Sequence, residues 1–492
     1  MTPNQGSQAN RTGRVTVLQF TCGLVLGAWI LAPQANAGED WVTFTDETNT
    51  RIVADPSVGV NDQEEKDLVA GDVDKDGDDD LVVVRKEPFT NPDGKRNVLF
   101  MNLNGVMTDM TATLAPDFLD LTNDRDVSLA DVDGDTWLDI ITSGTFEQQP
   151  RILMNLGESG GTWQGFAYDA SRLPHLESPA GVGPYFCGMA VGDLTGNGRP
   201  DIYFTDYGGF GPLGGSEAND LDDRLLINNG SGFFTDESEA RLTDEMRESV
   251  FGTDADIGDM NGDTFNDIIR SDSTGFNGPS SLQAPRQGSQ QDGGSLPNPA
   301  IIILYNDGTG NFPFAEGVYL AAPYMVAPAD FTQDGRLDLF VVDDAQDSYL
   351  INTGNDGNGH AQFSQTAVAP SPKTTGFGGN VSFADLDADG ILDVLVADVD
   401  TDIPGCDRRL ALLQGQGTPP NISFADPLGS ETRPWTPQGV FDVQAMHIND
   451  DGALDLWIGM CTGTRVFMGF SPEIFDDGFE SGDTSGWSTT VP

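Results

Sequence analysis

The sequence is short of basic residues. Its 492 residues include 24 Lys and Arg against 78 Asp and Glu, so the formal net charge is −54. Proteins that bind nucleic acid need stripes of Lys and Arg for the phosphate backbone, so this balance argues against DNA or RNA as a partner. It argues against an anionic membrane surface for the same reason. Such a charge favours solubility.

The sequence has few histidines, which limits the acid–base and nucleophilic catalysis that the chain could carry out. The three histidines are His175, His360 and His447, and none lies in a nucleophile elbow, an HExxH motif or another catalytic spacing. Paired carboxylates, the signature of glycosidases, are abundant, but the acidic repeats described below account for most of them. We therefore expect no enzymatic activity.

Long apolar runs are also missing, apart from one near the start of the chain. Residues 15–32 are mostly apolar, follow Arg11 and Arg14, and precede an A-x-A cleavage pattern at residues 35–37. The run is short and interrupted by polar residues, which argues against a retained membrane span. We predict a signal peptide over residues 1–37, cleavage after Ala37, and a secreted, periplasmic or cell-surface protein.

An acidic ten-residue pattern is present seven times. The first copy, Asp72–Leu81, has Asp at positions 1, 3, 5 and 9, Gly at position 6 and an apolar residue at position 10. The first residues of successive copies are 59, 62, 66, 71, 55 and 62 residues apart. Calcium takes six to eight oxygen ligands, and a tight loop can direct alternate side chains at one centre. The pattern therefore predicts up to seven calcium loops, here numbered one to seven.

The predicted ligands lie at positions 1, 3, 5 and 9 of each loop, except that loop one adds Asp78, whose position 7 carbonyl can face the ion, and loop seven lacks position 1. They are Asp72, Asp74, Asp76, Asp78 and Asp80 in loop one; Asp131, Asp133, Asp135 and Asp139 in loop two; Asp193, Thr195, Asn197 and Asp201 in loop three; Asp259, Asn261, Asp263 and Asp267 in loop four; Asp330, Thr332, Asp334 and Asp338 in loop five; Asp385, Asp387, Asp389 and Asp393 in loop six; and Asn449, Asp451 and Asp455 in loop seven.

The loops differ in how complete their ligand sets are. Loops one, two and six have an acid at positions 1, 3, 5 and 9, which makes them the strongest candidates. Loop seven is the weakest, because His447 stands at position 1 and calcium prefers oxygen to nitrogen. An EF-hand is excluded, because it requires a bidentate Glu at position 12 and flanking helices. No copy has an acid at position 12, and apolar runs such as Leu81–Val84 predict strands after the loops.

A second pattern follows each loop and completes a repeat of about sixty residues. An apolar strand meets an Asn-Gly or Asp-Gly turn, and a further strand starts at an aromatic residue, as in Arg224–Phe233. This is a hairpin signal. Each repeat is therefore expected to form an inner strand, an acidic loop, a second strand, a variable loop, a third strand, a Gly turn and an outer strand. Seven such sheets predict an all-β, seven-bladed β-propeller.

These residues resemble the FG-GAP and VCBS repeats of integrin α-subunit propellers and of many secreted bacterial proteins. Phe251-Gly252 and Phe377-Gly378 occupy the place of the FG pair. The resemblance covers about residues 41–470 and implies calcium as the cofactor. It also implies that ligands bind on the face formed by the variable loops.

The two ends of the repeat region are complementary. The last repeat stops after its third strand at Phe470, whereas residues 41–48 resemble the outer strand that starts at Phe233. We predict that residues 41–48 complete the seventh blade and close the ring, which removes an exposed sheet edge. The propeller then spans residues 38–470. Residues 471–492 break the pattern and are expected to be a flexible tail, with a sorting or attachment role as the alternative.

Three cysteines remain after the leader. Cys406 and Cys461 fall between the second and third strands of blades six and seven, so a disulfide between them is expected in an oxidising compartment. Two buried free thiols are the alternative. Cys187 starts an inner strand and is expected to stay a buried thiol.

The function hypothesis follows from the two faces of this scaffold. The acidic loops are uniform, whereas the variable loops, including residues 203–223 and 271–299, differ in length and composition, and binding usually resides in such loops. We expect a monomeric adhesion or recognition module for a glycan or protein ligand. The alternatives are a polysaccharide lyase or hydrolase on the same scaffold, and a purely structural surface protein.

Overall fold

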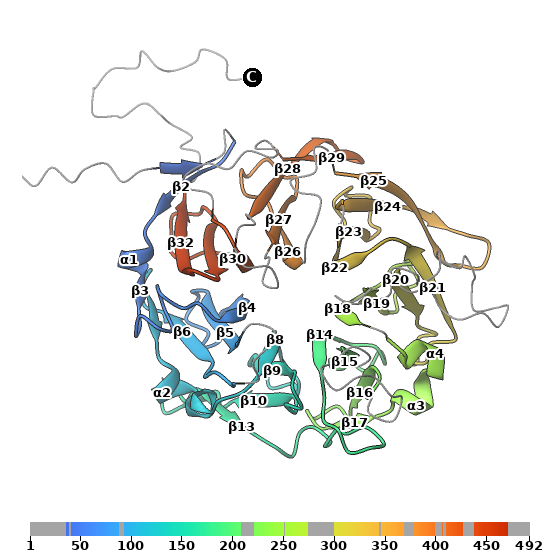
Figure 1. Cartoon of the computed structure of the whole chain (residues 1–492), viewed down its shortest axis with the longest axis horizontal. Coiled ribbons are helices and arrows are strands. Elements are labelled where there is room, and N and C mark those ends of the chain that lie inside the picture. The colour runs from blue at the N-terminus through green and yellow to red at the C-terminus, as the bar shows by residue number, and fades with distance from the viewer. Residues whose placement is uncertain are drawn as a thin grey trace, which may run out of the picture. The chain divides into compact units, whose positions relative to one another are not determined.

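Seven antiparallel sheets surround a common centre (Figure 1). The computed structural model describes residues 36–38, 41–87, 93–207, 221–249, 251–273, 300–343, 346–368, 378–398, 406, 410–426 and 437–470. From Asn36 onward these residues form a seven-bladed β-propeller, which confirms the predicted fold class. Each blade starts with an inner strand near the centre and ends with an outer strand at the rim.

The first four blades share one strand order. They consist of β4 (Glu65–Gly71), β5 (Asp80–Lys86), β6 (Val98–Asn102) and β7 (Met107–Asp109); β8 (Asp124–Ala130), β9 (Asp139–Gly144), β10 (Arg151–Asn155) and β13 (Phe166–Tyr168); β14 (Phe186–Gly192), β15 (Asp201–Asp206), β16 (Arg224–Asn228) and β17 (Phe234–Asp236); and β18 (Gly252–Gly258), β19 (Asp267–Asp272), β20 (Ala300–Tyr305) and β21 (Phe314–Tyr319). A small hairpin, β11 (Glu158–Ser159) with β12 (Thr162–Trp163), extends blade two.

The remaining blades repeat this order. They consist of β22 (Pro323–Ala329), β23 (Asp338–Asp343), β24 (Ser348–Asn355) and β25 (Ala361–Ala367); β26 (Gly378–Ala384), β27 (Asp393–Asp398), β28 (Ala411–Thr418) and β29 (Asn421–Ala425); and β30 (Val440–Met446), β31 (Asp455–Met460), β32 (Gly463–Gly469), β2 (Thr43–Asp46) and β1 (Asn36–Gly38). A short β3 (Ile52–Val53) runs parallel to β7 at the edge of blade one.

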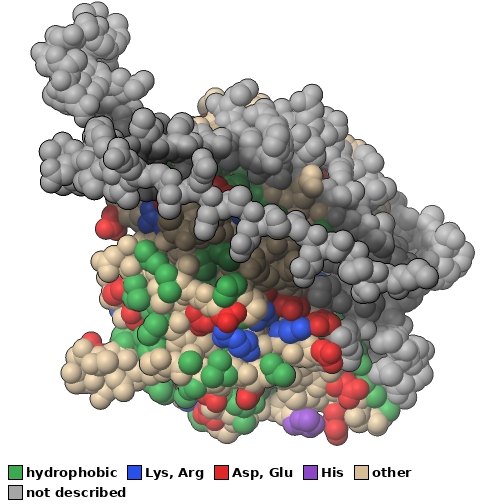
Figure 2. All heavy atoms as spheres, turned by 60° about the vertical axis from the view of Figure 1, so that its left-hand side comes forward, with side chains coloured by type: hydrophobic (Ala, Val, Ile, Leu, Met, Phe, Trp, Pro, Cys, Tyr) green, Lys and Arg blue, Asp and Glu red, His purple; other side chains and the backbone are tan. Residues whose placement is uncertain are grey.

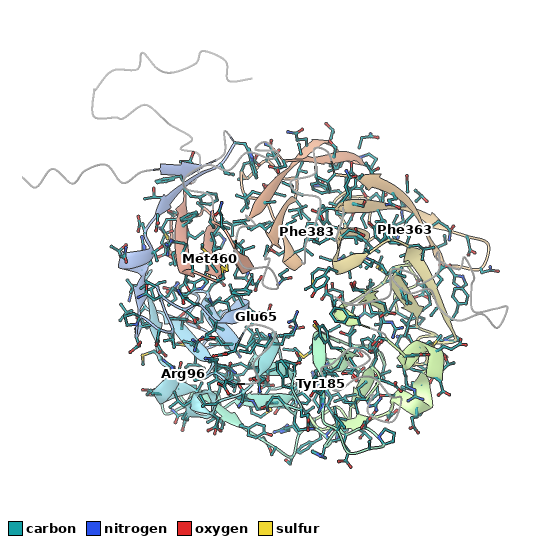
Figure 3. All side chains as sticks on the ribbon, viewed as in Figure 1. Glu65, Arg96, Tyr185, Phe363, Phe383 and Met460 are labelled. Carbon is teal, nitrogen blue, oxygen red and sulfur yellow. A yellow bond between two sulfur atoms is a disulfide. The ribbon has the colours of Figure 1, made fainter. Side chains whose placement is uncertain are left out.

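The second strands are buried along their length, polar residues included, because both faces of each sheet are covered by neighbouring blades. All seven residues of β5 are buried, for example. Apolar clusters fill the spaces between blades, and Phe100 of blade one lies 4.9 Å from Trp457 of blade seven between ring centroids. In Figure 3, Glu65 lies toward the centre of the ring and Arg96 lies toward its rim.

The N-terminal strand closes the ring as predicted. Strand β2 pairs antiparallel with β32, so that Phe44 lies opposite Gly469. The Phe44 side chain is 2 % exposed and stacks on Phe467 at 6.3 Å between centroids. The last blade is thus assembled from both ends of the repeat region, and the edge of β32 is covered by β2.

A short Thr-Asp-x-Thr motif explains why this segment takes the outer position. The Asp46 Oδ1 atom accepts hydrogen bonds from the Thr48 backbone N–H at 3.0 Å and from its hydroxyl at 2.6 Å. The Thr48 Oγ1 atom in turn accepts the Val466 N–H at 3.0 Å. The hydroxyl therefore joins the end of the outer strand to the third strand. Two other blades use the same arrangement, through Asp109, Thr111 and Leu99 and through Asp236, Ser238 and Leu225.

Each of these motifs starts a one-turn helix at the rim. They are α1 (Thr48–Arg51), α2 (Thr111–Leu114) and α3 (Ser238–Arg241); α4 (Asp244–Arg247) and a 3-10 turn at Pro116–Leu119 complete the helical segments. No helix among the described residues is long and apolar enough to cross a membrane. Residues 1–35 of the predicted 1–37 leader and the 471–492 tail lie outside the described residues, whereas Asn36 and Ala37 belong to β1, which pairs with β2.

Two of the three cysteines among the described residues are paired. Cys406 and Cys461 form a disulfide between blades six and seven, with their Cα atoms 6.3 Å apart. Cys187 is a buried free thiol on β14. The variable loops are shorter than expected, because residues 203–206 belong to β15 and residues 271–272 to β19. Most of the polar 271–299 stretch lies outside the described residues.

Substituting Phe44→Ala tests ring closure. Removal of a buried Phe side chain from a core costs about 3–5 kcal/mol, so the variant should lose that much unfolding free energy in denaturant titration. Thr43→Ala on the same strand is the control, because Thr43 is exposed and its change should stay within about 0.5 kcal/mol. Equal stability of the two variants would contradict closure by this strand.

Candidate functional site

The acidic loops are held in shape by their own carboxylates. Six loops have Asp at position 1, and its oxygens accept backbone N–H groups from across the loop. In loop three, for example, Asp193 accepts from Asn197 at 3.1 Å and from Gly198 at 2.7 Å. Position 6 has a left-handed φ in all seven loops, including Thr136 in loop two and Thr264 in loop four, with φ of 77° and 76°. The loops are therefore pre-formed turns.

Three loops bring three carboxylates together. Asp72, Asp74 and Asp80 each offer an oxygen, and these oxygens lie within 4.8 Å of one another. Loops two and six do the same with Asp131, Asp133 and Asp139, and with Asp385, Asp387 and Asp393. Oxygens that share one calcium ion at about 2.3–2.6 Å must lie within about 5 Å of each other, so this spacing fits a common cation. Among the described residues these are the three such groups, and they fall in the three loops richest in acids.

One buried carboxylate oxygen in the loops, Oδ1 of Asp72 in loop one, has no hydrogen-bond partner. A buried acceptor without a partner is unusual and needs a reason. Because Asp72 is a predicted ligand, a bound cation would supply the missing partner. The donor set of carboxylates and hydroxyls suits a hard ion such as Ca²⁺.

Other predicted ligands have different surroundings. The position 5 carboxylates Asp76, Asp135 and Asp389 each accept the N–H of position 7, at 3.0, 2.9 and 2.8 Å. In loop five, Asp334 is paired with the guanidinium of Arg336. In loop four, the Asn261 amide donates to Asp263 at 3.0 Å. The loops therefore differ in how much negative charge they leave for a cation.

The position 9 aspartates form the base of every loop. All seven are at most 1 % exposed, and Asp139 is typical: Oδ2 accepts the Val132 N–H at 3.0 Å and Oδ1 accepts the Asn155 N–H at 2.8 Å. One carboxylate thus joins the loop to the third strand. Burial raises the pKa of Asp80 to about 8 and that of Asp139 to about 7. Loss of solvation disfavours the charged form, so these groups gain from a neighbouring cation.

A buried asparagine couples five of the seven loops to the next blade, and the sequence interpretation missed it. Asn155 ends the third strand of blade two, and its Nδ2 donates to the Val73 carbonyl of loop one at 2.8 Å. Equivalent bonds join four other pairs of neighbouring blades, through Asn102, Asn228, Asn306 and Asn352. The recurring Asn was visible in the sequence, but it was interpreted as part of a turn. Gly415 and Gly469 take its place in blades six and seven.

A second set of carboxylates lies around the axis of the ring. Asp67, Asp126, Asp254 and Asp442 are each the third residue of an inner strand. Each accepts an N–H from the inner strand of the following blade at 2.7–2.9 Å; the donors are Val127, Met189, Val326 and Leu68. These bonds join four blade pairs at the centre, whereas Gly188, Met325 and Asn380 stand at this position in the other three blades.

Three of these carboxylates, Asp67, Asp126 and Asp254, line a central cavity of about 230 Å³, together with residues that include Glu65, Lys66 and Asp256. Burial raises the pKa of Asp126 to about 8, that of Asp254 to about 7 and that of Asp442 to about 6. The same cause holds the pKa of Asp67 and Asp256 well above the usual range. The interior of the ring therefore carries carboxyl groups that protonate near neutral pH.

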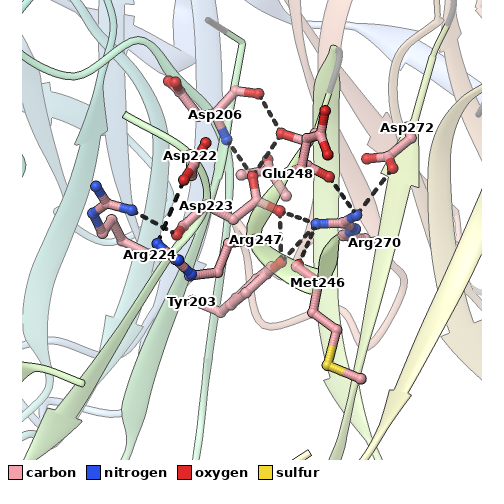
Figure 4. A network of polar contacts seen from close by, with 12 residues as sticks. Tyr203, Asp206, Asp222, Asp223, Arg224, Met246, Arg247, Glu248, Arg270 and Asp272 are labelled. Atoms are coloured by element: carbon pink, nitrogen blue, oxygen red, sulfur yellow. Dashed lines mark hydrogen bonds and ion pairs between the residues drawn. The ribbon is translucent and has the colours of Figure 1, made fainter. Parts of the chain in front are cut away.

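The face opposite the acidic loops contains a buried ionic network (Figure 4). Arg270 is fully buried and pairs with Asp223 and with Asp272, the latter at 3.1 Å. Its guanidinium also donates to the carbonyls of Met246 and Glu248. The Asp223 carboxylate accepts the Tyr203 hydroxyl at 2.6 Å as well. The network joins the variable-loop ends of blades three and four, where the axial carboxylate is replaced by Gly188.

Comparison with known proteins agrees with the geometry. Residues 72–142 and 330–396 match the FG-GAP-like repeat family, and these two segments contain loops one, two, five and six. The chain is a seven-bladed β-propeller with FG-GAP-like repeats.

The propeller is also similar to a solved structure. That structure is an Agrocybe aegerita lectin, described as specifically recognising non-reducing terminal N-acetylglucosamine. The identity is 15 %, the alignment covers 86 % of this chain and 93 % of that one, and the TM-score is 0.48. No curated protein matches the chain.

Changing Asn228→Asp tests the link between loops and neighbouring blades. The Asn228 amide donates to the carbonyls of Val132 at 2.8 Å and Pro200 at 3.0 Å, and a carboxylate would repel both. We expect a loss of about 3–5 kcal/mol in unfolding free energy. Asn229→Asp is the matched control, because its exposed side chain only accepts N–H groups. If both variants unfold alike, the asparagine bond does not couple the blades.

The axial carboxylates predict a pH effect on stability. Asp126 has a folded-state pKa of about 8, above its unfolded value near 4, so the folded state holds the proton more tightly. Its ionisation therefore removes stability as the pH rises from about 4 to about 8. Asp126→Asn cannot ionise and keeps an acceptor for Met189, so its stability relative to wild type should increase between pH 5 and pH 8.

Denaturant unfolding at both pH values in saturating calcium would measure this difference. We expect Asp126→Asn to gain more than about 1 kcal/mol relative to wild type over that range. The exposed Asp120→Asn is the control and should show no such trend. A difference that does not change with pH would contradict the assignment.

Proposed function

We propose that the propeller is a secreted, calcium-binding recognition module for a glycan or protein ligand. The observation that carries the proposal is the convergence of three carboxylates in each of loops one, two and six, on one face of a closed ring. Calcium would neutralise these groups and hold the loops in place, which leaves the opposite face free for ligand binding. Variable connections on a rigid scaffold are the usual place for such a role.

A buried ionic network lies under the variable face, which is the face formed by the variable loops. The fully buried Arg270 network joins Asp206 and Asp223, at the two ends of one long connection, to Asp272, at the start of another. A buried ion pair is a weak source of net stability but fixes geometry, because breaking it leaves a charge without a partner. The strand ends from which these connections leave are thereby held in fixed positions, as recognition requires.

Secretion is supported by the chemistry of the chain. The Cys406–Cys461 disulfide suits an oxidising compartment, and the N-terminal residues have the pattern of a cleaved leader. Acidic side chains are spread over the coloured surface in Figure 2, whereas basic side chains gather in a few places. With a net charge of −54, a glycan or a protein is a better partner than a nucleic acid.

Glycan arrays and pull-downs with the full chain, in calcium and in chelator, would test the proposal. We expect binding to at least one glycan or protein class in calcium and loss of that binding in chelator. Hydrogen exchange in the presence of the bound ligand should show protection on the variable face, for example over residues 178–185, and none in the acidic loops. Turnover of a polysaccharide by the purified protein would instead favour the enzyme alternative. Protection confined to the acidic loops would contradict the assigned face.

A further inference from the structure

Loop seven is closed in a way that the other six are not. In loops one to six the residue at position 1 is Asp, and its carboxylate accepts backbone N–H groups of positions 5 and 6, or of position 6 alone in loop one. In loop seven position 1 is His447, whose ring offers nitrogen in place of two carboxylate oxygens. The first ligand and its charge are therefore both missing.

The imidazole of the exposed His447 turns back onto its own loop. Its Nδ1 atom lies 2.9 Å from the carbonyl oxygen of Ala453, which is position 7. A carbonyl oxygen can only accept a hydrogen bond, so Nδ1 must carry the proton and donate it. Position 7 is the residue whose backbone carbonyl faces the ion in calcium loops of this spacing. The ring N–H thus donates to the carbonyl oxygen that a bound ion would otherwise have as a ligand.

The rest of loop seven is intact. Asp455 at position 9 accepts the Ile448 N–H at 2.8 Å, and Asp451 at position 5 accepts the Ala453 N–H at 2.9 Å. The His447 backbone N–H donates to Asp79 of loop one at 3.0 Å. The loop therefore keeps the backbone arrangement of its relatives, and the change is confined to the first side chain.

Loop four is a natural comparison. Its ligands are Asp259, Asn261, Asp263 and Asp267, and loop seven has Asn449, Asp451 and Asp455 at the last three of these positions. The position 3 amide donates to the position 5 carboxylate at 3.0 Å in both loops. Among the four ligand positions the two loops differ only at position 1, where one has Asp and the other His.

We propose that the His447 imidazole replaces the ion in loop seven, so that blade seven holds no calcium and His447→Asp creates a site there. The inference rests on the proposed calcium binding of the other loops. Blade seven is also the blade completed by β2 and joined to blade six by the Cys406–Cys461 disulfide. The blade that closes the ring is thus the one whose loop folds without metal.

The number of calcium ions bound per chain, measured by native mass spectrometry on the full chain, tests this directly. His447→Asp should bind one ion more than wild type, and His447→Asp with Asp451→Asn should return to the wild-type number. Asp451→Asn alone should lose none. His175→Asp, at a side chain that is 69 % exposed and outside the loops, adds the same charge and should leave the number unchanged.

The outcomes separate this inference from the proposed function. Asp387→Asn in loop six should lose one ion, and failure there would contradict calcium binding itself. If Asp387→Asn loses one ion and Asp451→Asn also loses one, loop seven binds calcium and the inference is wrong. If His447→Asp gains none, the inference is likewise wrong. The Asp451→Asn arm keeps the test decisive even if His447→Asp does not fold.

Discussion

Every blade depends on one buried carboxylate, the Asp at position 9 of its loop. This group accepts one backbone N–H from the loop and another from the end of the third strand, and it is at most 1 % exposed in all seven blades. Hydrogen bonds to a charged acceptor are stronger than neutral ones, yet burial of the charge opposes its ionisation. The loop is therefore tied to the sheet through a group that favours a nearby cation.

The same constraint extends from blade to blade. Where the third strand ends in Asn, its amide donates to the preceding loop, as Asn155 does to Val73. At the axis, carboxylates such as Asp126 accept N–H groups of the next inner strand. The junction of blades five and six has Met325 and Gly415 at these two positions, and a cluster of aromatic rings around Phe331 and Phe424 fills it instead. Apolar packing thus replaces both polar links at this junction.

Much of the fold could be predicted from the sequence, because each repeat has the residue pattern of its strands and turns. The seven acidic patterns, the order of strands in each blade and the closure by residues 41–48 all follow from local residue types and their spacing. Closure was visible because Phe-Thr-Asp at residues 44–46 matches residues 234–236, and the following hydroxyl that completes the motif explains the match.

The contacts between blades could not be predicted in the same way. Asn155 and Val73 are 82 residues apart, and the same Asn is a good turn residue in its own right. Asp126 stands in an ordinary strand, and only the ring brings it beside Met189 of the next blade. The role of His447 also depends on the folded loop, which places its ring against Ala453. Comparison of equivalent positions across all seven repeats would have found the asparagine.

Thermal unfolding in calcium and in chelator, at constant ionic strength, tests the central claim that cations hold these loops and hence the ring. Three ions at about a hundred times their dissociation constants would each contribute about 2.7 kcal/mol. The account therefore predicts that chelation lowers Tm by on the order of 10 °C. Calcium should restore Tm, and magnesium should do so only weakly because it requires stricter octahedral geometry. An unchanged Tm in chelator would contradict the account.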